Sequence, residues 1–158
     1  MKTTKELYQE WKALPEKCDL TGEQALEAVS KNGKALQYVQ EQVPEICLAA
    51  VIKDGEALKY VMKQTPEICL AAVSQNGCAI QYVREQTPEI CMVAVSRNGY
   101  ALQHVRKQTP EICLAAVSQD GHALRYVHEQ TPEICMAAIT QKRESLQYVK
   151  EDIFANFV

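Results

Sequence analysis

Residues 21–152 consist of one 22-residue unit that occurs six times in succession. The third and fifth copies, residues 65–86 and 109–130, are identical at 17 of 22 positions. A fixed period of this length is typical of a stacked array, in which no unit can bury its apolar face without its neighbours. The fold can therefore be predicted from a single unit, whose positions we number from its first residue, usually Thr.

The first helix of each unit is predicted from its start and stop signals. Thr-Pro-Glu supplies an N-cap hydroxyl, a proline at the first helical position and a carboxylate at the positive end of the helix dipole. The apolar run that follows, such as residues 68–73, predicts a helix buried on all sides. Asn-Gly or Asp-Gly then predicts a stop with the glycine in the left-handed conformation. These glycines are Gly33, Gly55, Gly77, Gly99 and Gly121.

A second, short amphipathic helix of eight or nine residues is predicted after the glycine. Ala, Leu and Val at positions 15, 16 and 19 form its apolar stripe, and the Tyr at position 18 should lie half-buried at the edge. No segment alternates with period two, which argues against the strands of a leucine-rich repeat. The predicted fold is all-α: a right-handed-type αα solenoid of six 22-residue two-helix repeats.

The two ends are predicted to cap the array, so that the chain forms one domain. Its predicted parts are an N-terminal cap at residues 1–20, six repeats at residues 21–152 and an apolar C-terminal cap at residues 153–158. The N-terminal cap should hold a helix over residues 4–14, with Leu7, Trp11 and Leu14 on one side. The C-terminal tail includes Phe154 and Phe157, and its alternative role is a protruding peptide that docks elsewhere.

Two rows of potentially reactive side chains are interpreted as structural. Five cysteines share position 5, inside the apolar run: Cys47, Cys69, Cys91, Cys113 and Cys135. No C-x-x-C pair occurs, and the helix spacing of about 8–10 Å between units exceeds disulfide reach, so we expect small buried hydrophobic side chains. The glutamate at position 3 of every unit should stabilise the first helical turn.

The sequence contains no motif for chemistry. A phosphate-binding glycine loop, a nucleophile elbow and a metal-binding helix motif are all missing, so we expect a non-enzymatic protein without cofactor, metal or small-molecule substrate. The formal charge of -3 and the lack of a long apolar run argue against membrane association. Without a secretory signal the chain is expected in the cytoplasm, with signal-less export left open.

The pattern PEICLAAVxxNGxALQYVxEQ resembles a bacterial family of 22-residue α-helical repeats catalogued only as a domain of unknown function. The resemblance covers about residues 21–152. It implies an α-helical array and provides no activity that could be assigned to residues of this chain.

A binding surface is predicted where the copies differ. Position 14 reads Lys34, Glu56, Cys78, Tyr100, His122 and Glu144. Positions 14, 17 and 21 would share one face of the second helix, and aromatic and basic residues of this helix gather in the fourth and fifth copies. The predicted partner-binding residues are Tyr100, His104, Arg106, Lys107, His122, Arg125 and His128.

These observations favour a protein–protein interaction module, either an adaptor or an inhibitor, whose Tyr and Arg side chains anchor the partner. Nucleic-acid binding by the same face is the first alternative, since Tyr can stack on bases and Arg can contact phosphate. The overall acidity, together with Glu85 and Glu129 among the basic residues, argues against it. A structural or self-associating array is the second alternative. The sequence specifies neither the partner nor the oligomeric state.

Overall fold

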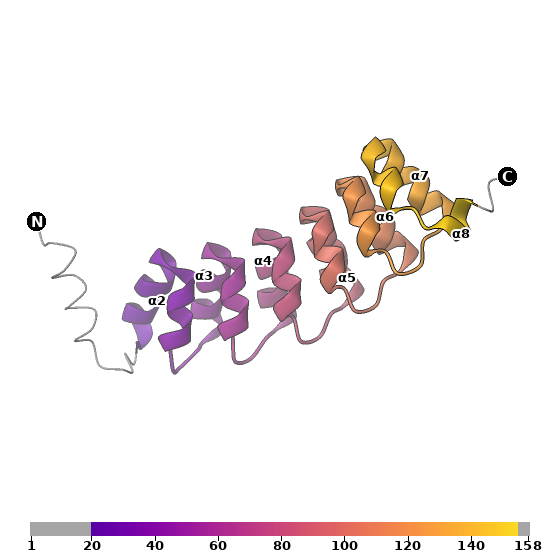
Figure 1. Cartoon of the computed structure of the whole chain (residues 1–158). Coiled ribbons are helices and arrows are strands. Elements are labelled where there is room, and N and C mark those ends of the chain that lie inside the picture. Colours follow the sequence, from indigo (N-terminus) through magenta and orange to yellow (C-terminus); the bar gives the residue numbers. More distant parts are fainter. Residues whose placement is uncertain (1–19, 155–158) are drawn as a thin grey trace, which may run out of the picture.

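A computed structural model describes residues 20–154, without the side chain of Phe154 (Figure 1). Over this range, α-helices and 3-10 helices alternate, and a short α8 (Glu151–Phe154) follows. The α-helices are α2 (Gly22–Lys31), α3 (Pro44–Lys53), α4 (Pro66–Gln75), α5 (Pro88–Arg97), α6 (Pro110–Gln119) and α7 (Pro132–Gln141). The 3-10 helices are η1 (Gly33–Tyr38), η2 (Gly55–Tyr60), η3 (Gly77–Tyr82), η4 (Gly99–His104), η5 (Gly121–Tyr126) and η6 (Arg143–Tyr148).

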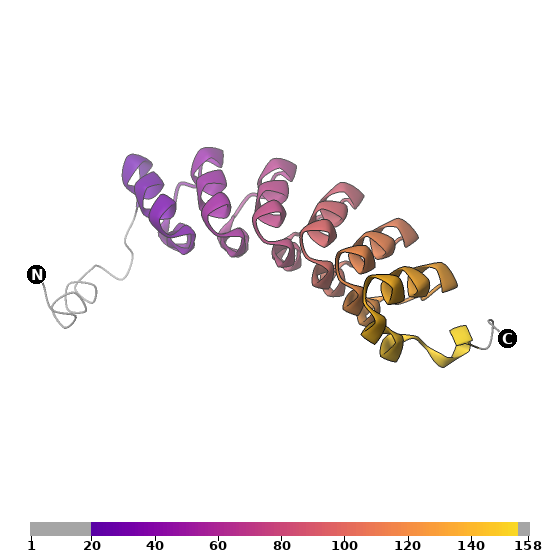
Figure 2. The same ribbon diagram turned by 90° about the horizontal axis from the view of Figure 1, so that it is seen from above.

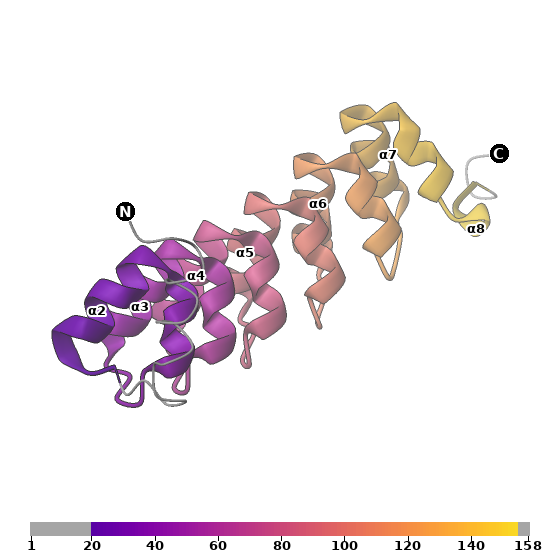
Figure 3. The same ribbon diagram turned by 60° about the vertical axis from the view of Figure 1, so that its left-hand side comes forward.

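The helix pairs stack side by side into a curved row (Figures 1 and 2). Each α-helix packs against the α-helices of adjacent repeats and against the 3-10 helices of its own and the preceding repeat. In Figure 2 the α-helices lie on the outer side of the arc and the 3-10 helices on its inner side. The loops that lead from each 3-10 helix to the next α-helix follow one edge of the row, which we call the loop edge (Figure 3). The predicted all-α solenoid is thus confirmed.

One continuous apolar core runs through all the repeats. Repeats two to five contribute the same seven buried positions, and in the third these are Ile68, Cys69, Ala72, Val73, Ala79, Ile80 and Val83. The sequence predicted that the α-helix is buried on all sides, and this prediction is wrong. Leu70 and Ala71 of α4 are only half-buried. Both residues pack against the edge of the core.

The predicted N-cap is confirmed in four repeats. The hydroxyl of Thr65 accepts a hydrogen bond from the amide of Ile68 at 3.3 Å, and the threonines that begin the next three repeats do the same. The side chains of Thr21 and Val43 make no such bond. Proline follows the cap in α3 to α7, where its missing N–H costs nothing.

The second helix differs from the prediction in type and length. It is a 3-10 helix of six residues that begins at the glycine and ends at position 18. The preceding Asn or Asp caps it, as when Oδ1 of Asn76 accepts from the amide of Cys78 at 3.0 Å. Because three residues complete a 3-10 turn, positions 14 and 17 lie above one another, whereas positions 20 and 21 are outside the helix. The prediction of one helical face through positions 14, 17 and 21 is therefore wrong.

The repeat positions require glycine because of close packing. A left-handed backbone, which the sequence had predicted, does not occur there. Gly22 alone among the described residues has a positive φ, of 53°. A Cβ on Gly77 would lie 2.4 Å from the carbonyl oxygen of Ala94 in the next repeat, and the other repeat glycines show the same short approach. In the sixth repeat, after which the structure describes no further repeat, this position holds the exposed Arg143.

The predicted caps are described only in part. The helix over residues 4–14 lies outside the described residues, as do Phe157 and Val158 at the other end. Ile153 on α8 is 7% exposed and belongs to the common core. Leu146 of the last repeat is 47% exposed, whereas its equivalent Leu124 is fully buried against the following repeat.

Candidate interaction surface

The structure separates the predicted binding residues into two regions. Tyr100, His122 and Arg125 lie on η4 and η5, on the inner side of the arc. Arg106, Lys107 and His128 lie on the loop edge, beyond the ends of these helices. His104 is the half-buried last residue of η4. Positions 14, 17 and 21 were placed on one face by α-helical periodicity, which does not apply to a 3-10 helix that ends at position 18.

Position 14 bridges neighbouring repeats, with a different chemistry at different junctions. Nζ of Lys34 lies 3.9 Å from a carboxylate oxygen of Glu56 in the next repeat. The amide nitrogen of Asn98 donates to Sγ of Cys78 at 3.2 Å. Tyr100 and His122 contact rings of the following repeats, as described below. The variation at position 14 therefore reflects contacts between particular repeats as well as exposure.

Five side chains of repeats four to six form an aromatic cluster, composed of Tyr100, His122, Arg125, Tyr126 and Tyr148. The rings of Tyr100 and Tyr126 meet edge to face with centroids 5.9 Å apart, and those of His122 and Tyr148 with centroids 5.6 Å apart. The Arg125 guanidinium lies 5.1 Å from the Tyr126 ring and 5.7 Å from the Tyr148 ring. Edge-to-face pairs and cation–π contacts each contribute about 0.5–1.5 kcal/mol, so the cluster is held together before any partner binds.

The cluster is open to solvent at its cation. Arg125 is exposed and has no ion pair with any residue in the range 20–154. The four rings are half-buried, and Nε2 of His122 is buried without a hydrogen-bond partner among the described residues. Partial burial raises the pKa of the Tyr100 hydroxyl, and the carboxylate of Asp120 adds to this rise. The cluster thus presents a fixed cation between two aromatic rings, together with a neutral phenol.

A row of glutamines, which we did not recognise from the sequence, joins the repeats at the loop edge. Nε2 of Gln108 donates to the carbonyl oxygen of Tyr126 at 2.9 Å, and its Oε1 accepts from the amide of His128 at 3.0 Å. Equivalent bonds are made by Gln42, Gln64, Gln86 and Gln130. The signal was present, since position 22 is Gln in the first five copies and Asp152 in the last. The glutamines fix the backbone that carries the rings of Tyr126 and Tyr148.

Arg106 also has a structural contact. Its guanidinium donates to the carbonyl oxygens of Arg84 at 2.8 Å and Val83 at 3.2 Å, in the preceding repeat. Arg84 makes the same pair of bonds one repeat earlier, and Nζ of Lys150 reaches the carbonyl of His128. These hydrogen bonds satisfy carbonyl oxygens left free at the ends of 3-10 helices and hold the cations at the loop edge.

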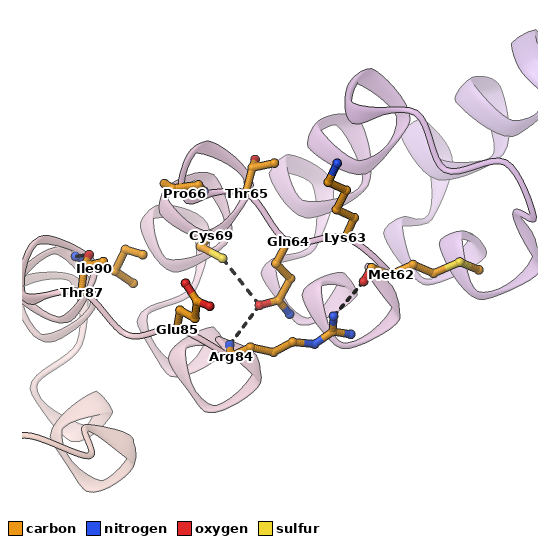
Figure 4. Close-up of a pocket in the computed structure, with 10 residues that line it drawn as sticks. All are labelled: Met62, Lys63, Gln64, Thr65, Pro66, Cys69, Arg84, Glu85, Thr87 and Ile90. Carbon is orange, nitrogen blue, oxygen red and sulfur yellow. Dashed lines mark hydrogen bonds between the residues drawn. The ribbon is translucent and has the colours of Figure 1, made fainter.

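Three cavities open at successive junctions along the loop edge, and we call them the loop-edge pockets. Their volumes are about 290, 220 and 180 Å³. Each is lined by the Pro and Cys of one α-helix and the Thr and Ile of the next, which in the first pocket are Pro66, Cys69, Thr87 and Ile90 (Figure 4). In Figure 4 the amide of Gln64 lies between the Cys69 thiol and the Arg84 backbone.

The core cysteines are buried thiols, as predicted. All five are at most 4% exposed and none is in a disulfide. Burial raises the pKa of each of these thiols: Cys47, Cys69, Cys91, Cys113 and Cys135. Four of them point at the glutamine row, as when Sγ of Cys113 lies 3.6 Å from Oε1 of Gln108. The thiols are therefore protonated packing groups at neutral pH.

Neither metal-binding nor membrane-spanning features occur in the part of the chain that is described. Residues 20–154 contain no group of three or more His, Cys, Asp or Glu side chains placed to hold a metal ion. Within the same range, every helix is too short or too polar to cross a membrane. The glutamates at position 3 lie in the first turn of α2 to α7, as expected. Hydrogen bonds to its own backbone amide and to Thr109 lower the pKa of Glu111.

The fold defines this protein as an α-helical repeat solenoid, in which the 3-10 helices on the inner side of the arc carry the residues of the aromatic cluster. The model of a family described as "Domain of unknown function (DUF4116)" matches residues 43–87, 66–108, 87–131 and 109–154. These matches cover more than half of the chain, which therefore belongs to this family. Each match spans about two repeats, in agreement with a unit that needs its neighbour to form a core. No curated protein and no solved structure matches the chain.

Proposed function

We propose that the chain is a non-enzymatic interaction module that binds a partner protein through the aromatic cluster on the inner side of the arc. The observation that carries this proposal is the Arg125 guanidinium, which is exposed and lies against two tyrosine rings. Tyr and Arg are enriched among the residues that supply most of the affinity in protein interfaces. Side chains already fixed by neighbours lose little entropy on binding, which favours their use as anchors.

The charge of the cluster indicates what the partner presents. Arg125 has no carboxylate partner within residues 20–154, so an acidic side chain of the partner could pair with it and accept bidentate hydrogen bonds. The half-buried rings of Tyr126 and Tyr148 provide apolar surface beside that pair. We therefore expect the partner to present a carboxylate flanked by apolar groups. Adaptor and inhibitor are both compatible with such a contact.

The arrangement of basic groups favours a protein over a nucleic acid as the partner. Arg84, Arg106 and Lys150 donate to backbone carbonyls of the preceding repeat. Glu85 and Glu129 lie among the basic residues of the same edge, and the formal charge of the chain is -3, both of which disfavour the binding of phosphates. Location in the cytoplasm is part of the same proposal, supported by the six free thiols among residues 20–154.

The test is recovery of the partner from a cell lysate of the source organism with a tagged full-length chain. Tyr100→Ala combined with Arg125→Glu removes one ring and reverses the cation. The matched control is Glu56→Ala combined with Lys59→Glu, at the same two positions of the second repeat, where Lys59 lies 4.9 Å from the Tyr60 ring. Nuclease treatment of the lysate removes proteins bridged by nucleic acid.

We expect one or more proteins to be recovered by the wild type and the control but lost, by at least tenfold, with the cluster variant. Circular dichroism should show that both variants keep the helical fold of the wild type. Equal recovery by all three chains would contradict a role for the cluster. Loss of the recovered protein on nuclease treatment would instead support the nucleic-acid alternative.

A further inference from the structure

The loop-edge pockets repeat with the same chemistry at three successive junctions. The second pocket is lined by Pro88, Cys91, Thr109 and Ile112, and the third by the residues 22 positions further along. They lie on the loop edge and share no residue with the aromatic cluster. Neighbouring helices pack about 8–10 Å apart, so the pockets follow one another at about that interval.

Each pocket contains an apolar patch, formed by the proline of one α-helix and the isoleucine of the next. The amide of Gln64 is already bonded to the Tyr82 carbonyl, the Arg84 amide and the Cys69 thiol. The other uncharged residues that line the first pocket are the proline, the isoleucine, two threonines, Met62 and Cys69, whose buried thiol is protonated. Even the smallest pocket, with a volume of about 180 Å³, has room for an aliphatic side chain.

The residues that line the pockets also carry an excess of positive charge. The cations are Lys63, Arg84, Arg106 and Lys107, and the carboxylates are Glu85 and Glu129. Arg106 and Lys107 both line the middle pocket, which has no carboxylate among its lining residues. Acidic groups between the apolar anchors of a ligand would therefore be favoured at this place.

We propose that the three loop-edge pockets bind an extended, polyproline-II segment of a partner protein, which places one aliphatic side chain in each pocket and acidic residues between them. A polyproline-II helix has three residues per turn and rises about 3.1 Å per residue, so every third side chain points the same way at about 9 Å spacing. This spacing matches that of the pockets. An extended β-strand repeats a side every second residue, at about 6.6 Å, and does not match.

The site is tested with synthetic nine-residue peptides, fluorescently labelled and followed by anisotropy with the full-length chain. The probe repeats Val-Pro-Asp or Leu-Pro-Asp three times, and its control contains the same residues with the aliphatic ones adjacent. In the protein, Lys107→Trp places a large ring at the exposed rim of the middle pocket. Ser118→Trp, at an exposed position of α6 that lines none of the three pockets, is the matched control.

We expect the period-three peptide to bind at least tenfold more tightly than the rearranged one, and Lys107→Trp to weaken it at least tenfold while Ser118→Trp leaves it unchanged. The peptide should still bind the Tyr100→Ala, Arg125→Glu variant. This result would separate the test of the loop-edge pockets from the test of the aromatic cluster. The inference is overturned if neither peptide binds at 1 mM, if both bind equally, or if the two Trp variants behave alike.

Discussion

The side-chain amide of Gln86 donates to the carbonyl oxygen of His104 at 2.9 Å, across the boundary between the third and fourth repeats. The oxygen of the same amide accepts from the backbone N–H of Arg106 at 3.0 Å. His104 is the last residue of η4, and Arg106 lies at the start of the loop that follows. The Gln86 side chain therefore fixes the backbone at the junction between η4 and this loop. Repetition of this contact along the row gives each repeat its register with its neighbour.

Replacement of Gln86 should therefore weaken the whole array. Gln86→Leu keeps the volume but leaves a carbonyl and an amide of the fourth repeat without partners, and we expect unfolding free energy to fall by about 2–4 kcal/mol. The measurement is urea unfolding followed by circular dichroism. Gln103→Leu is the control, because its exposed amide bonds only to Tyr100 within its own repeat, and it should cost less than about 0.5 kcal/mol. Similar losses for the two variants would contradict the role of Gln86.

The repeat glycines should reject any side chain. Gly77→Ala places a methyl group against the carbonyl oxygen of Ala94, and we expect a loss of about 1–3 kcal/mol from overpacking. Gly77→Asn should be no better tolerated, although Asn accepts a left-handed backbone. At Gly22, where φ is 53° and a Cβ would contact nothing within 4 Å, Asn should instead be tolerated better than Ala. Unfolding midpoints of the four variants decide between close packing and backbone strain.

Arg106 should contribute to stability, in contrast to its neighbour. Arg106→Gln removes two hydrogen bonds from a guanidinium to backbone carbonyls, and because the side chain is exposed we expect a loss of about 1 kcal/mol. Lys107→Gln removes the same charge without breaking such bonds and should change unfolding free energy by less than about 0.5 kcal/mol. If calorimetry finds the two variants equally stable, the hydrogen bonds of Arg106 to the carbonyl oxygens do not contribute to the free energy of unfolding.

The core thiols predict a loss of stability at alkaline pH. Burial raises the pKa of the Cys91 thiol and its four equivalents above the ordinary value of 9.0, so the folded chain keeps protons that the unfolded chain releases. Stability is then complete below about pH 9 and decreases as pH rises further. Urea midpoints between pH 7 and 10 test this, with Cys91→Ala expected to show a shallower decline. A midpoint that stays constant up to pH 10 would be inconsistent with buried thiols.

Much of the repeat could be predicted from residues that act locally. Thr65 caps α4 because a hydroxyl before Pro-Glu does so in any helix, and Cys69 is buried because the run around it is apolar. The 3-10 geometry could not be predicted in this way, since a short segment such as residues 77–82 takes its form from the neighbours that it packs against. Gly77 was recognised from the sequence as the end of a helix. The requirement for glycine there comes from the carbonyl oxygen of Ala94, which belongs to the next repeat and leaves no room for a Cβ.

The candidate site was predicted in part for the same reason. Tyr100, His122 and Arg125 were recognised as unusual side chains within their repeats, and the structure brings them together. Tyr100 contacts Tyr126, and His122 and Arg125 contact Tyr148, in each case in the following repeat, so a face drawn on one helix could not include these contacts. Arg106, Lys107 and His128 were placed on that face by α-helical periodicity, and they lie instead on the loop edge.

The central claim, that a partner protein binds at the aromatic cluster, is tested most directly by hydroxyl-radical footprinting of the tyrosines in the complex recovered from the lysate. Mass spectrometry reports the modification of each ring with and without the partner. We predict that Tyr100, Tyr126 and Tyr148 are protected by at least threefold, while Tyr38, which is 46% exposed in the first repeat, and Tyr60 stay unchanged. Protection of Tyr38 or Tyr60 with no change at the three cluster tyrosines would contradict the proposed surface.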